Sequence, residues 1–192
     1  LDITASIAPS AAGIKGAYES RAACYRSLVE DETRSEPNIH MRFGLDNEDI
    51  ARHDGERVVG ALSWPIGVFV HPDHNWLGAS PDGRFHRMGL HEIKCRDSEP
   101  YDDIPPHHMA QIQIQLACAG CGQCFYQSWT PNEQRIWLVK TSKPYFDWII
   151  PFLTEFRTFL VRREVPPTLR PRRVYPDPIP YELIYEGAHD EL

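Results

Sequence analysis

Residues 80–95 read SPDGRFHRMGLHEIKC, and they decide the fold because an aspartate behind a proline stands ten positions before a Glu-x-Lys pair. The proline fixes φ before Asp82 and a glycine relieves the turn after it, so a tight turn is predicted. The GLHEIKC end predicts a strand, in which Glu92 and Lys94 point to one face because alternate side chains share a face. If the intervening residues form a short hairpin, Asp82 returns beside Glu92.

Two carboxylates held a few ångströms apart repel each other unless a cation lies between them. The oxygen ligands of Asp82 and Glu92 suit Mg²⁺ or Mn²⁺ rather than Zn²⁺. Such an ion lowers the pKa of a bound water and neutralises charge on a phosphoryl oxygen, while Lys94 can orient that water or stabilise the transition state. The stretch thus predicts a metal site that hydrolyses phosphodiester bonds. The alternative is a surface turn and an edge strand with an exposed Glu–Lys pair.

A helix predicted over residues 39–52 offers a third carboxylate. Met41, Gly44, Leu45 and Glu48 fall at i, i+3, i+4 and i+7, which is one stripe of a helix. A carboxylate on an inward face needs a partner, because burying it alone is costly. A metal ion would supply that partner; the alternative is a glutamate at the edge of the stripe whose tip reaches solvent.

Three glutamines, Gln111, Gln113 and Gln115, interrupt an otherwise apolar helix that is predicted to begin at a Pro-Pro pair and to end at Gly120 or Gly122. Gln111 and Gln115 share a face of this helix. They could hydrogen-bond the attacking water, the lysine of the strand or a phosphate. The alternative is that they are ordinary polar residues at a helix surface.

The rest of the chain predicts alternating helices and strands. With 192 residues, 42% of them apolar, it is expected to form one globular domain. The order of helices, mixed sheet, helix, strands and helix favours an α/β fold, an α+β sandwich. We expect this domain to span residues 1–165, and a proline-rich, extended tail to span residues 166–192. The further expected segments are a helix over 15–32, a break at Pro37-Asn38, strands within 58–70, a loop over 71–83, a hairpin of CFYQSW and RIWLVK, and a helix over 144–163.

Charge and cysteine content limit the function classes. The formal net charge is −7, so any nucleic-acid contact is expected in a local basic groove rather than over the whole surface. Five cysteines are an odd number, which argues against a secreted disulfide framework and for a reducing compartment inside the cell, cytoplasm or nucleus. No apolar run is long enough for a membrane helix, and no signal peptide opens the chain.

Other metal-binding patterns are weaker. The spacing of Cys118, Cys121 and Cys124, with Cys95 or Cys24, would suit zinc or an iron–sulfur cluster, but small buried cysteines are the favoured interpretation. The histidines of HPDH (71–74) and of the pair at 107–108 are weaker zinc candidates still. Trp76 either stacks on a base or packs in the core.

Four motifs of the chain occur in one order, and a fifth precedes them. They are Phe-Gly-x-x-x-Glu (43–48), Gly-Ala-Ser-Pro-Asp-Gly (78–83), Glu-Ile-Lys-Cys (92–95), Met-Ala-Gln-Ile-Gln (109–113) and, first, Thr-Ala-Ser (4–6). Together they resemble the phage lambda exonuclease / YqaJ viral-recombinase family of PD-(D/E)XK nucleases, over most of the chain. The resemblance implies a restriction-endonuclease-like core, with a mixed central sheet flanked by helices.

The resemblance also implies a set of metal ligands. Asp82 and Glu92 would bind Mg²⁺, with Mn²⁺ as a substitute, and the Ile93 carbonyl would be a further ligand. Glu48 would complete the site. The family's phage members carry another acidic ligand about ten residues before the Pro-Asp aspartate, where this chain has a proline followed by Asp73. A second-metal role for Asp73 stays open.

Catalytic and DNA-binding roles follow in the same way. Lys94, acting with the two carboxylates, would be catalytic, and Gln111 would support the nucleophile. Ser6, from the Thr-Ala-Ser match, would hold the DNA 5′ phosphate, with Gln113 as a further DNA contact. The arginine that precedes this motif in the family would fall upstream of Leu1, which leaves 5′-phosphate recognition open.

The activity implied by the resemblance is a Mg²⁺-dependent 5′-to-3′ exonuclease that degrades one strand of linear duplex DNA, as in recombination. Duplex DNA ends would be its partners, together with a single-strand annealing protein. The oligomeric state stays open: phage members of the family imply a homotrimeric ring, and viral relatives imply a monomer. A viral or phage origin would fit. Two alternatives stay open: an endonuclease on DNA or RNA with the same core, and a non-catalytic DNA-binding or assembly module.

Overall fold

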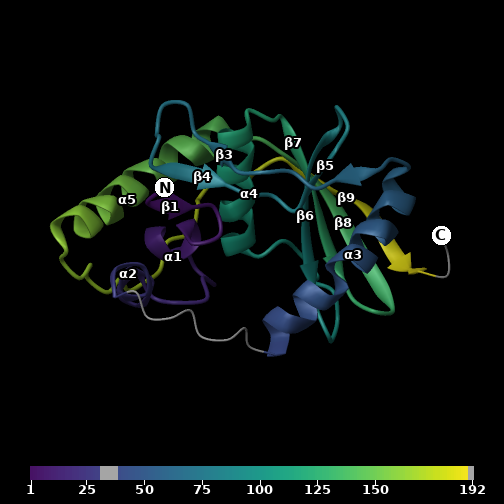
Figure 1. Cartoon of the computed structure of the whole chain (residues 1–192), viewed down its shortest axis with the longest axis horizontal. Helices are drawn as coiled ribbons and strands as arrows, with labels where there is room; N and C mark the ends of the chain where they lie inside the picture. The colour runs from purple at the N-terminus through teal and green to yellow at the C-terminus, as the bar shows by residue number, and fades with distance from the viewer. Residues whose placement is uncertain (31–38, 190–192) are drawn as a thin grey trace.

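The computed structural model describes residues 1–30 and 39–189 (Figure 1). The predicted helix end at Glu32 and the predicted break at Pro37-Asn38 lie outside the described residues. The helices are α1 (Ala8–Ala12), α2 (Arg21–Val29), α3 (Ile39–Val59), α4 (Pro106–Ala119) and α5 (Lys143–Arg162). The strands are β1 (Ile3–Thr4), β2 (Ser63–Trp64), β3 (Phe69–Val70), β4 (Leu77–Ala79), β5 (Gly83–Phe85), β6 (Gly89–Cys95), β7 (Gln123–Trp129), β8 (Glu133–Lys140) and β9 (Tyr181–Ala188).

The central sheet is mixed, as the sequence predicted, with the strand order β2-β5-β6-β7-β8-β9. The short hairpin of β5 and β6 pairs Gly83 with His91, so Asp82 precedes the pair on one strand and Glu92 follows it on the other. Strands β6 and β7 are parallel, and α4 is the crossover between them. The predicted hairpin of β7 and β8 is present and antiparallel.

One helix covers each face of this sheet (Figure 1). On one face Ile93 packs with Ala51 of α3. On the other face Leu90 packs with Ile112 and Leu116 of α4. The alternation of β6 therefore sends Glu92 and Lys94 toward α4, and His91 and Ile93 toward α3.

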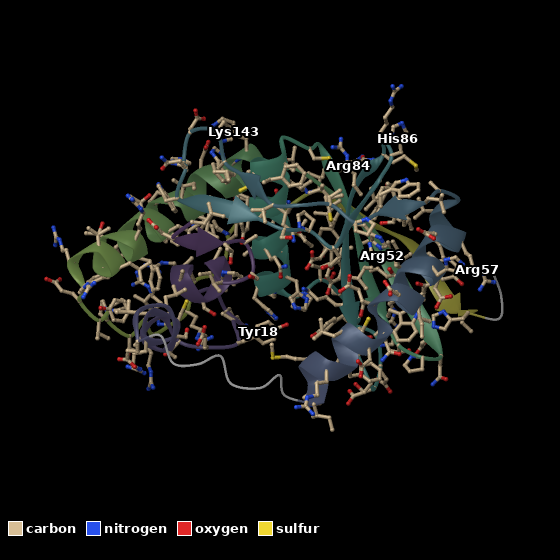
Figure 2. The ribbon with its side chains drawn as sticks, in the orientation of Figure 1. Tyr18, Arg52, Arg57, Arg84, His86 and Lys143 are labelled. Atoms are coloured by element: carbon tan, nitrogen blue, oxygen red, sulfur yellow. The ribbon has the colours of Figure 1, made fainter. Side chains whose placement is uncertain are left out.

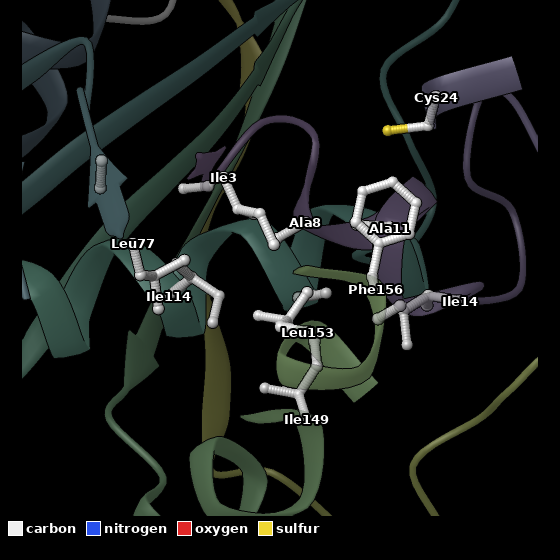
Figure 3. Packing of buried hydrophobic residues seen from close by; sticks show 14 of the residues in the cluster. Ile3, Ala8, Ala11, Ile14, Cys24, Leu77, Ile114, Ile149, Leu153 and Phe156 are labelled. Atoms are coloured by element: carbon white, nitrogen blue, oxygen red, sulfur yellow. The ribbon is translucent and has the colours of Figure 1, made fainter. Parts of the chain in front are cut away.

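A second layer lies on the outer side of α4. The small sheet β1-β4-β3, α1 and α5 pack there around the largest buried apolar cluster (Figure 3). Ile114 of α4 reaches this cluster, whereas Ile112 reaches the central sheet, so α4 is buried on two sides. Because α4 is buried on two sides, the amide nitrogens of its glutamines donate to groups inside the protein. The buried Oε1 of Gln115 has no partner among the described residues.

Helix α3 continues seven residues past the predicted end at Arg52, to Val59. Residues 53–59 contain no proline to end the helix earlier. Gly60, which has φ +72°, accepts the left-handed conformation that ends helices. Gly55, inside α3, would place a Cβ 2.8 Å from Gln127 Oε1, so the missing side chain lets α3 approach the sheet. The strands predicted within 58–70 are accordingly shorter.

Three further segments differ from the sequence-based expectations. The predicted loop over 71–83 contains β4, a strand that exists because β1 and β3 pair with it on either side. Helix α2 begins later than predicted, at Arg21, and its N-cap is Ser20, whose side chain accepts the Ala23 N–H at 3.2 Å. Within the predicted tail, residues 181–188 are extended as β9, which pairs with β8 at the edge of the central sheet. The helix predicted over 144–163 is α5.

Candidate active site

The hairpin brings Asp82 and Glu92 together, as its sequence predicted. Asp82 Oδ2 accepts a hydrogen bond from the Ile93 backbone N–H at 2.6 Å. This bond follows the last backbone pair of β5 and β6 and holds the Asp82 carboxylate beside β6. Glu92 is almost fully buried, at 1% exposure. A buried carboxylate needs several donors, because its charge has left water.

Three side chains donate to Glu92. Lys94 Nζ and Gln111 Nε2 both reach Glu92 Oε1 at 2.6 Å, and Gln115 Nε2 reaches Oε2 at 2.7 Å. The predicted shared face of Gln111 and Gln115 is thereby confirmed, and it lies over the predicted face of the strand. The arrangement fixes the orientation of the Glu92 carboxylate and of the lysine beside it.

The electrostatics of the group show strong coupling. Burial, and then the negative charge of Glu92, raise the pKa of Asp82 well above its usual range. Burial alone would lower the pKa of Lys94, but the carboxylates of Glu92 and Asp82 outweigh it and raise the pKa. Lys94 is therefore charged at neutral pH, and the Asp82 carboxylate would gain from a further cation.

Glu48 lies on α3 at the edge of this group, where its charge contributes to the raised pKa of Asp82. Its Oε1 accepts a hydrogen bond from Arg52 Nη2 at 2.6 Å, and Arg52 Nη1 donates to the Asp82 carbonyl at 2.8 Å. The predicted inward stripe is wrong in one respect: Met41 and Leu45 are exposed, at 59% and 66%. The residues that α3 buries are Ala51 and Gly55. The partner of Glu48 in this structure is Arg52.

The Gln113 side chain points away from Glu92, which Gln111 and Gln115 contact. It is 1% exposed; its Nε2 donates to the Lys140 carbonyl at 2.9 Å, and its Oε1 accepts the Ser142 N–H at 2.8 Å. The side chain thus joins α4 to the end of β8 and the start of α5. This placement argues against the predicted DNA contact, because both ends of the amide are used inside the protein.

We predict that Gln113→Leu lowers the free energy of unfolding by about 1–3 kcal/mol, because a buried N–H and a buried carbonyl lose their partner. Denaturant unfolding of the variant and of the wild type measures the difference. Any residual catalytic activity per folded molecule should stay at the wild-type level. An unchanged stability would show that these two hydrogen bonds contribute nothing.

The other predicted site residues are distributed around the carboxylates. Ser6 is exposed, and its Oγ lies 3.1 Å from Thr4 Oγ1. The Ala5 N–H donates to the Gly78 carbonyl at 2.8 Å, which sets the Thr-Ala-Ser segment beside the strand that leads into the Asp82 turn. Asp73 lies in the loop before that strand, where its N–H donates to His71 Nδ1 at 3.2 Å. That loop is at the opposite end of β4 from the Asp82 turn.

The weaker metal patterns gain no support. Within residues 1–30 and 39–189, no three His, Cys, Asp or Glu side chains are grouped to hold a metal ion. Both ring nitrogens of His108 are engaged, one with Tyr18 Oη at 2.8 Å and one with Tyr126 Oη at 2.7 Å. Cys118 and Cys124 are buried in two different apolar clusters. Trp76 is partly buried against the larger of these clusters.

Sequence reasoning missed two polar contacts that hold the site. Arg52 ties α3 to the Asp82 turn (Figure 2), and its i+4 spacing from Glu48 on a helix was the available signal. His91 lies on the far face of β6, where it bonds Ser63 Oγ at 2.9 Å and Gln127 Oε1 at 2.8 Å. Burial lowers the pKa of His91 to about 3, so the ring is neutral. Nothing local in the sequence indicated that Ser63 and Gln127 would be the partners of His91.

The donor set fits a divalent metal ion. Asp82 and Glu92 offer carboxylate oxygens. Burial, and then the charge of Glu92, raise the pKa of Asp82, so a cation beside it would stabilise the carboxylate. Glu48 would have to leave Arg52 to join them. Among the described residues no third His, Cys, Asp or Glu side chain is grouped with Asp82 and Glu92. Two carboxylates suit Mg²⁺ or Mn²⁺ better than zinc.

An aspartate in a turn, a Glu-x-Lys strand beside it and a helix on each face of a mixed sheet define the fold of the PD-(D/E)XK nucleases. The chain belongs to the YqaJ-like viral recombinase domain family, whose model matches residues 2–122. No curated protein matches the chain.

Solved structures share the fold. The alkaline exonuclease LHK-Exo from Laribacter hongkongensis superposes with a TM-score of 0.70 at 24% identity, over 84% of this chain and 89% of that chain. Its complex with dAMP gives a TM-score of 0.71 at 23% identity, over the same shares of the two chains. A phage-related exonuclease from Haemophilus somnus 129PT gives a TM-score of 0.68 at 10% identity, over 85% of this chain and 95% of that chain.

None of the helices in the described part of the chain has the length and apolar character of a membrane span.

Proposed function

We propose that the chain is a metal-dependent deoxyribonuclease, a 5′-to-3′ exonuclease that degrades one strand of linear duplex DNA. The observation that carries the proposal is the group of Asp82, Glu92 and Lys94, in which the lysine Nζ lies 2.6 Å from a Glu92 oxygen. Family membership and the shared fold support a nuclease. Burying two carboxylates with one lysine lowers the stability of the fold. The presence of such a group therefore favours a chemical role.

Some of the residues would bind the metal ion, and Lys94 would act on the attacking water or on the transition state. Asp82 and Glu92, with the Ile93 carbonyl and Glu48, would hold a divalent ion, which when bound neutralises charge on a phosphoryl oxygen and makes water a better nucleophile. The charged Lys94 would orient the attacking water or stabilise charge in the transition state. Gln111 and Gln115 would keep the Glu92 carboxylate in one orientation through their hydrogen bonds.

We predict that Mn²⁺ binds between Asp82 and Glu92. Burial, and then the charge of Glu92, raise the pKa of Asp82, and a cation between the two carboxylates would offset both effects. Anomalous diffraction from crystals soaked in Mn²⁺ would locate the ion. A soak in Mg²⁺, which gives almost no anomalous signal, is the control. Anomalous density at another position only, with none shared by these two carboxylates, would contradict the assignment.

We predict that linear duplex DNA loses nucleotides from its ends and that covalently closed circles are spared. Phosphate contacts carry little sequence information, so a site that accepts an end acts on any sequence. DNA with a 5′ phosphate should be degraded faster than DNA with a 5′ hydroxyl if the phosphate is bound by Ser6, which is exposed next to a residue that pairs with β4. End-labelled linear duplexes and closed circles, each with Mg²⁺ or EDTA, provide the test.

The same assay separates the rival functions. Rapid conversion of closed circles into fragments would favour an endonuclease, and RNA should be included as a substrate. Tight DNA binding without any cleavage in Mg²⁺ or Mn²⁺ would favour a non-catalytic module. The proposal includes a homotrimer around DNA, which sedimentation would test, and a single-strand annealing partner, which co-purification would test. It also includes a location in a reducing compartment inside the cell.

A further inference from the structure

An exposed aromatic ring lies beside the Asp82–Glu92–Lys94 group. It belongs to Tyr18, in the turn between α1 and α2 (Figure 2), and 77% of this residue is exposed. A single exposed ring is common on a protein surface and needs no explanation by itself. This ring differs in two respects, because it is held in a fixed position and that position is next to the active site.

The Tyr18 hydroxyl is bonded to the helix that faces Glu92. It lies 2.8 Å from His108 Nε2. His108, Gln111 and Gln115 stand at i, i+3 and i+7 on α4, which is one stripe of a helix. The two glutamines of this stripe donate to Glu92. Tyr18 therefore contacts the first residue of the stripe that surrounds the buried carboxylate.

His108 is fixed from the side of the sheet as well. Its Nδ1 lies 2.7 Å from Tyr126 Oη, and Tyr126 on β7 is the register partner of Glu92. Burial, and then the charge of Lys94, lower the pKa of His108 to about 2, so the ring is neutral. A neutral imidazole has one donor and one acceptor, and the two tyrosine hydroxyls use both. The imidazole of His108 thus links Tyr18 to the strand next to Glu92.

The turn that carries Tyr18 is also held by contacts. The Ala17 carbonyl accepts a hydrogen bond from Arg172 Nη1 at 2.7 Å. The rings of Tyr18 and His107 lie with their centroids 4.9 Å apart and their planes at 80°. Gly16, at φ +85°, would place a Cβ 2.7 Å from His107 Nδ1, so the turn packs directly on this histidine. A ring that is already fixed loses little conformational entropy when it binds a ligand.

The catalytic group and the Tyr18 hydroxyl lie within electrostatic range of each other. Burial raises the pKa of Tyr18, the charge of Lys94 opposes that rise, and the charge of Glu92 adds to it. The Lys94 side chain is 24% exposed and Asp82 is partly exposed, so solvent reaches the group. A nucleotide that approached Lys94 would therefore have the Tyr18 ring nearby.

We propose that a DNA base stacks on the exposed ring of Tyr18 while a phosphate of the same strand lies at Lys94. This inference rests on the proposed function and adds a DNA-binding residue to it. Every base has an aromatic face, so stacking on a tyrosine holds a strand without reading its sequence. Tyr18 would thus position the strand for cleavage, and His108 would hold the ring in place through the hydroxyl.

Binding of a labelled linear duplex, measured by fluorescence anisotropy, tests the proposal. Ca²⁺ replaces Mg²⁺ as the oxygen-liganded ion, and a denaturing gel of the same samples checks that the DNA is intact. We expect Tyr18→Leu to weaken binding by at least about fivefold, because the stacked base loses its aromatic partner. Tyr18→Phe should bind nearly as the wild type does, because it keeps the ring. Tyr181→Leu is the control, since Tyr181 on β9 is likewise an exposed tyrosine with a bonded hydroxyl.

Tyr18→Phe and Tyr18→Leu both lose the hydrogen bond to His108, so their comparison separates the ring from the hydroxyl. An equal loss of binding in the two variants would show that the hydroxyl alone matters and would overturn the proposal. Wild-type affinity in Tyr18→Leu, or an equal loss in Tyr181→Leu, would also overturn it.

A double-mutant cycle with the DNA identifies the stacked base. Duplexes that lack one base, at the first, second or third nucleotide from the 5′ end, are bound to the wild type and to Tyr18→Leu. At one position, removal of the base should weaken wild-type binding at least about fivefold and should have little further effect in Tyr18→Leu, because the two changes remove the same contact. Additive losses at all three positions would contradict stacking. A wild type that shows this coupling but does not cut DNA in Mg²⁺ would refute the proposed nuclease function alone.

Discussion

Glu92→Gln is expected to abolish both metal binding and cleavage of linear duplex DNA, with turnover reduced by at least about 10³-fold, which corresponds to about 4 kcal/mol of barrier. Glu92 shares its carboxylate among Lys94, Gln111 and Gln115, so its replacement removes the charge at the centre of the group. An amide oxygen still accepts one hydrogen bond, but it no longer attracts a divalent ion strongly. Steady-state cleavage and Mn²⁺ titration measure the two losses.

The variant must be shown to fold before these losses are interpreted. Glutamine has the size of glutamate, so packing against α4 is retained, but Lys94 loses its closest carboxylate and stability should fall. Thermal unfolding without metal reports that change separately. The control is Glu182→Gln, which removes the same charge from an exposed position on β9 and should leave both readouts unchanged. Wild-type metal affinity in a folded Glu92→Gln protein would contradict the assigned site.

Lys94→Ala is expected to lower turnover by about 10²-fold or more, close to 3 kcal/mol of transition-state stabilisation, while Mn²⁺ binding stays largely intact. Lys94 is charged because Glu92 and Asp82 raise its pKa. It is the residue of the group that can stabilise negative charge developing on a phosphate. Its loss leaves Glu92 with the two glutamine donors, so the carboxylates remain in place.

The matched control is Lys143→Ala, which removes a lysine at the start of α5 that is paired with Asp147 on the surface (Figure 2). Exposed pairs of this kind contribute little to stability, and no effect on cleavage is expected. A split between kcat and metal affinity in Lys94→Ala, with neither moved in the control, would support the proposed role. Cleavage by Lys94→Ala at the wild-type rate would show that the lysine is not catalytic.

Much of the candidate site could be predicted from the sequence, because its centre is local. A Pro-Asp-Gly turn and a seven-residue strand determine the approach of Asp82 to Glu92, and the period of a strand sets Lys94 on the same face. Positions four apart on a helix put Gln111 and Gln115 together. The five motifs added the order in which these pieces follow one another, and the family match agrees with it.

Other features depended on parts of the chain that are distant in sequence. Strand β4 has little strand character of its own and forms because β1 and β3 pair with it, and β9 joins β8 across a long separation. The inward stripe predicted for α3 was wrong at Met41 and Leu45, because α3 turns another face toward the sheet, that of Phe43, Ala51 and Gly55.

The sequence by itself determined the hairpin, the spacing of its charges and the extents of α4 and α5, because turns, caps and side-chain periods act over a few residues. Tertiary structure decided which partner each polar group received: Gln113 bonds the end of β8, Glu48 bonds Arg52, and His91 bonds Ser63 and Gln127. The physical reason is that a buried polar group takes whatever donor or acceptor packing brings within about 3 Å of it. That choice depends on how the helices settle on the sheet, which no short stretch of the chain specifies.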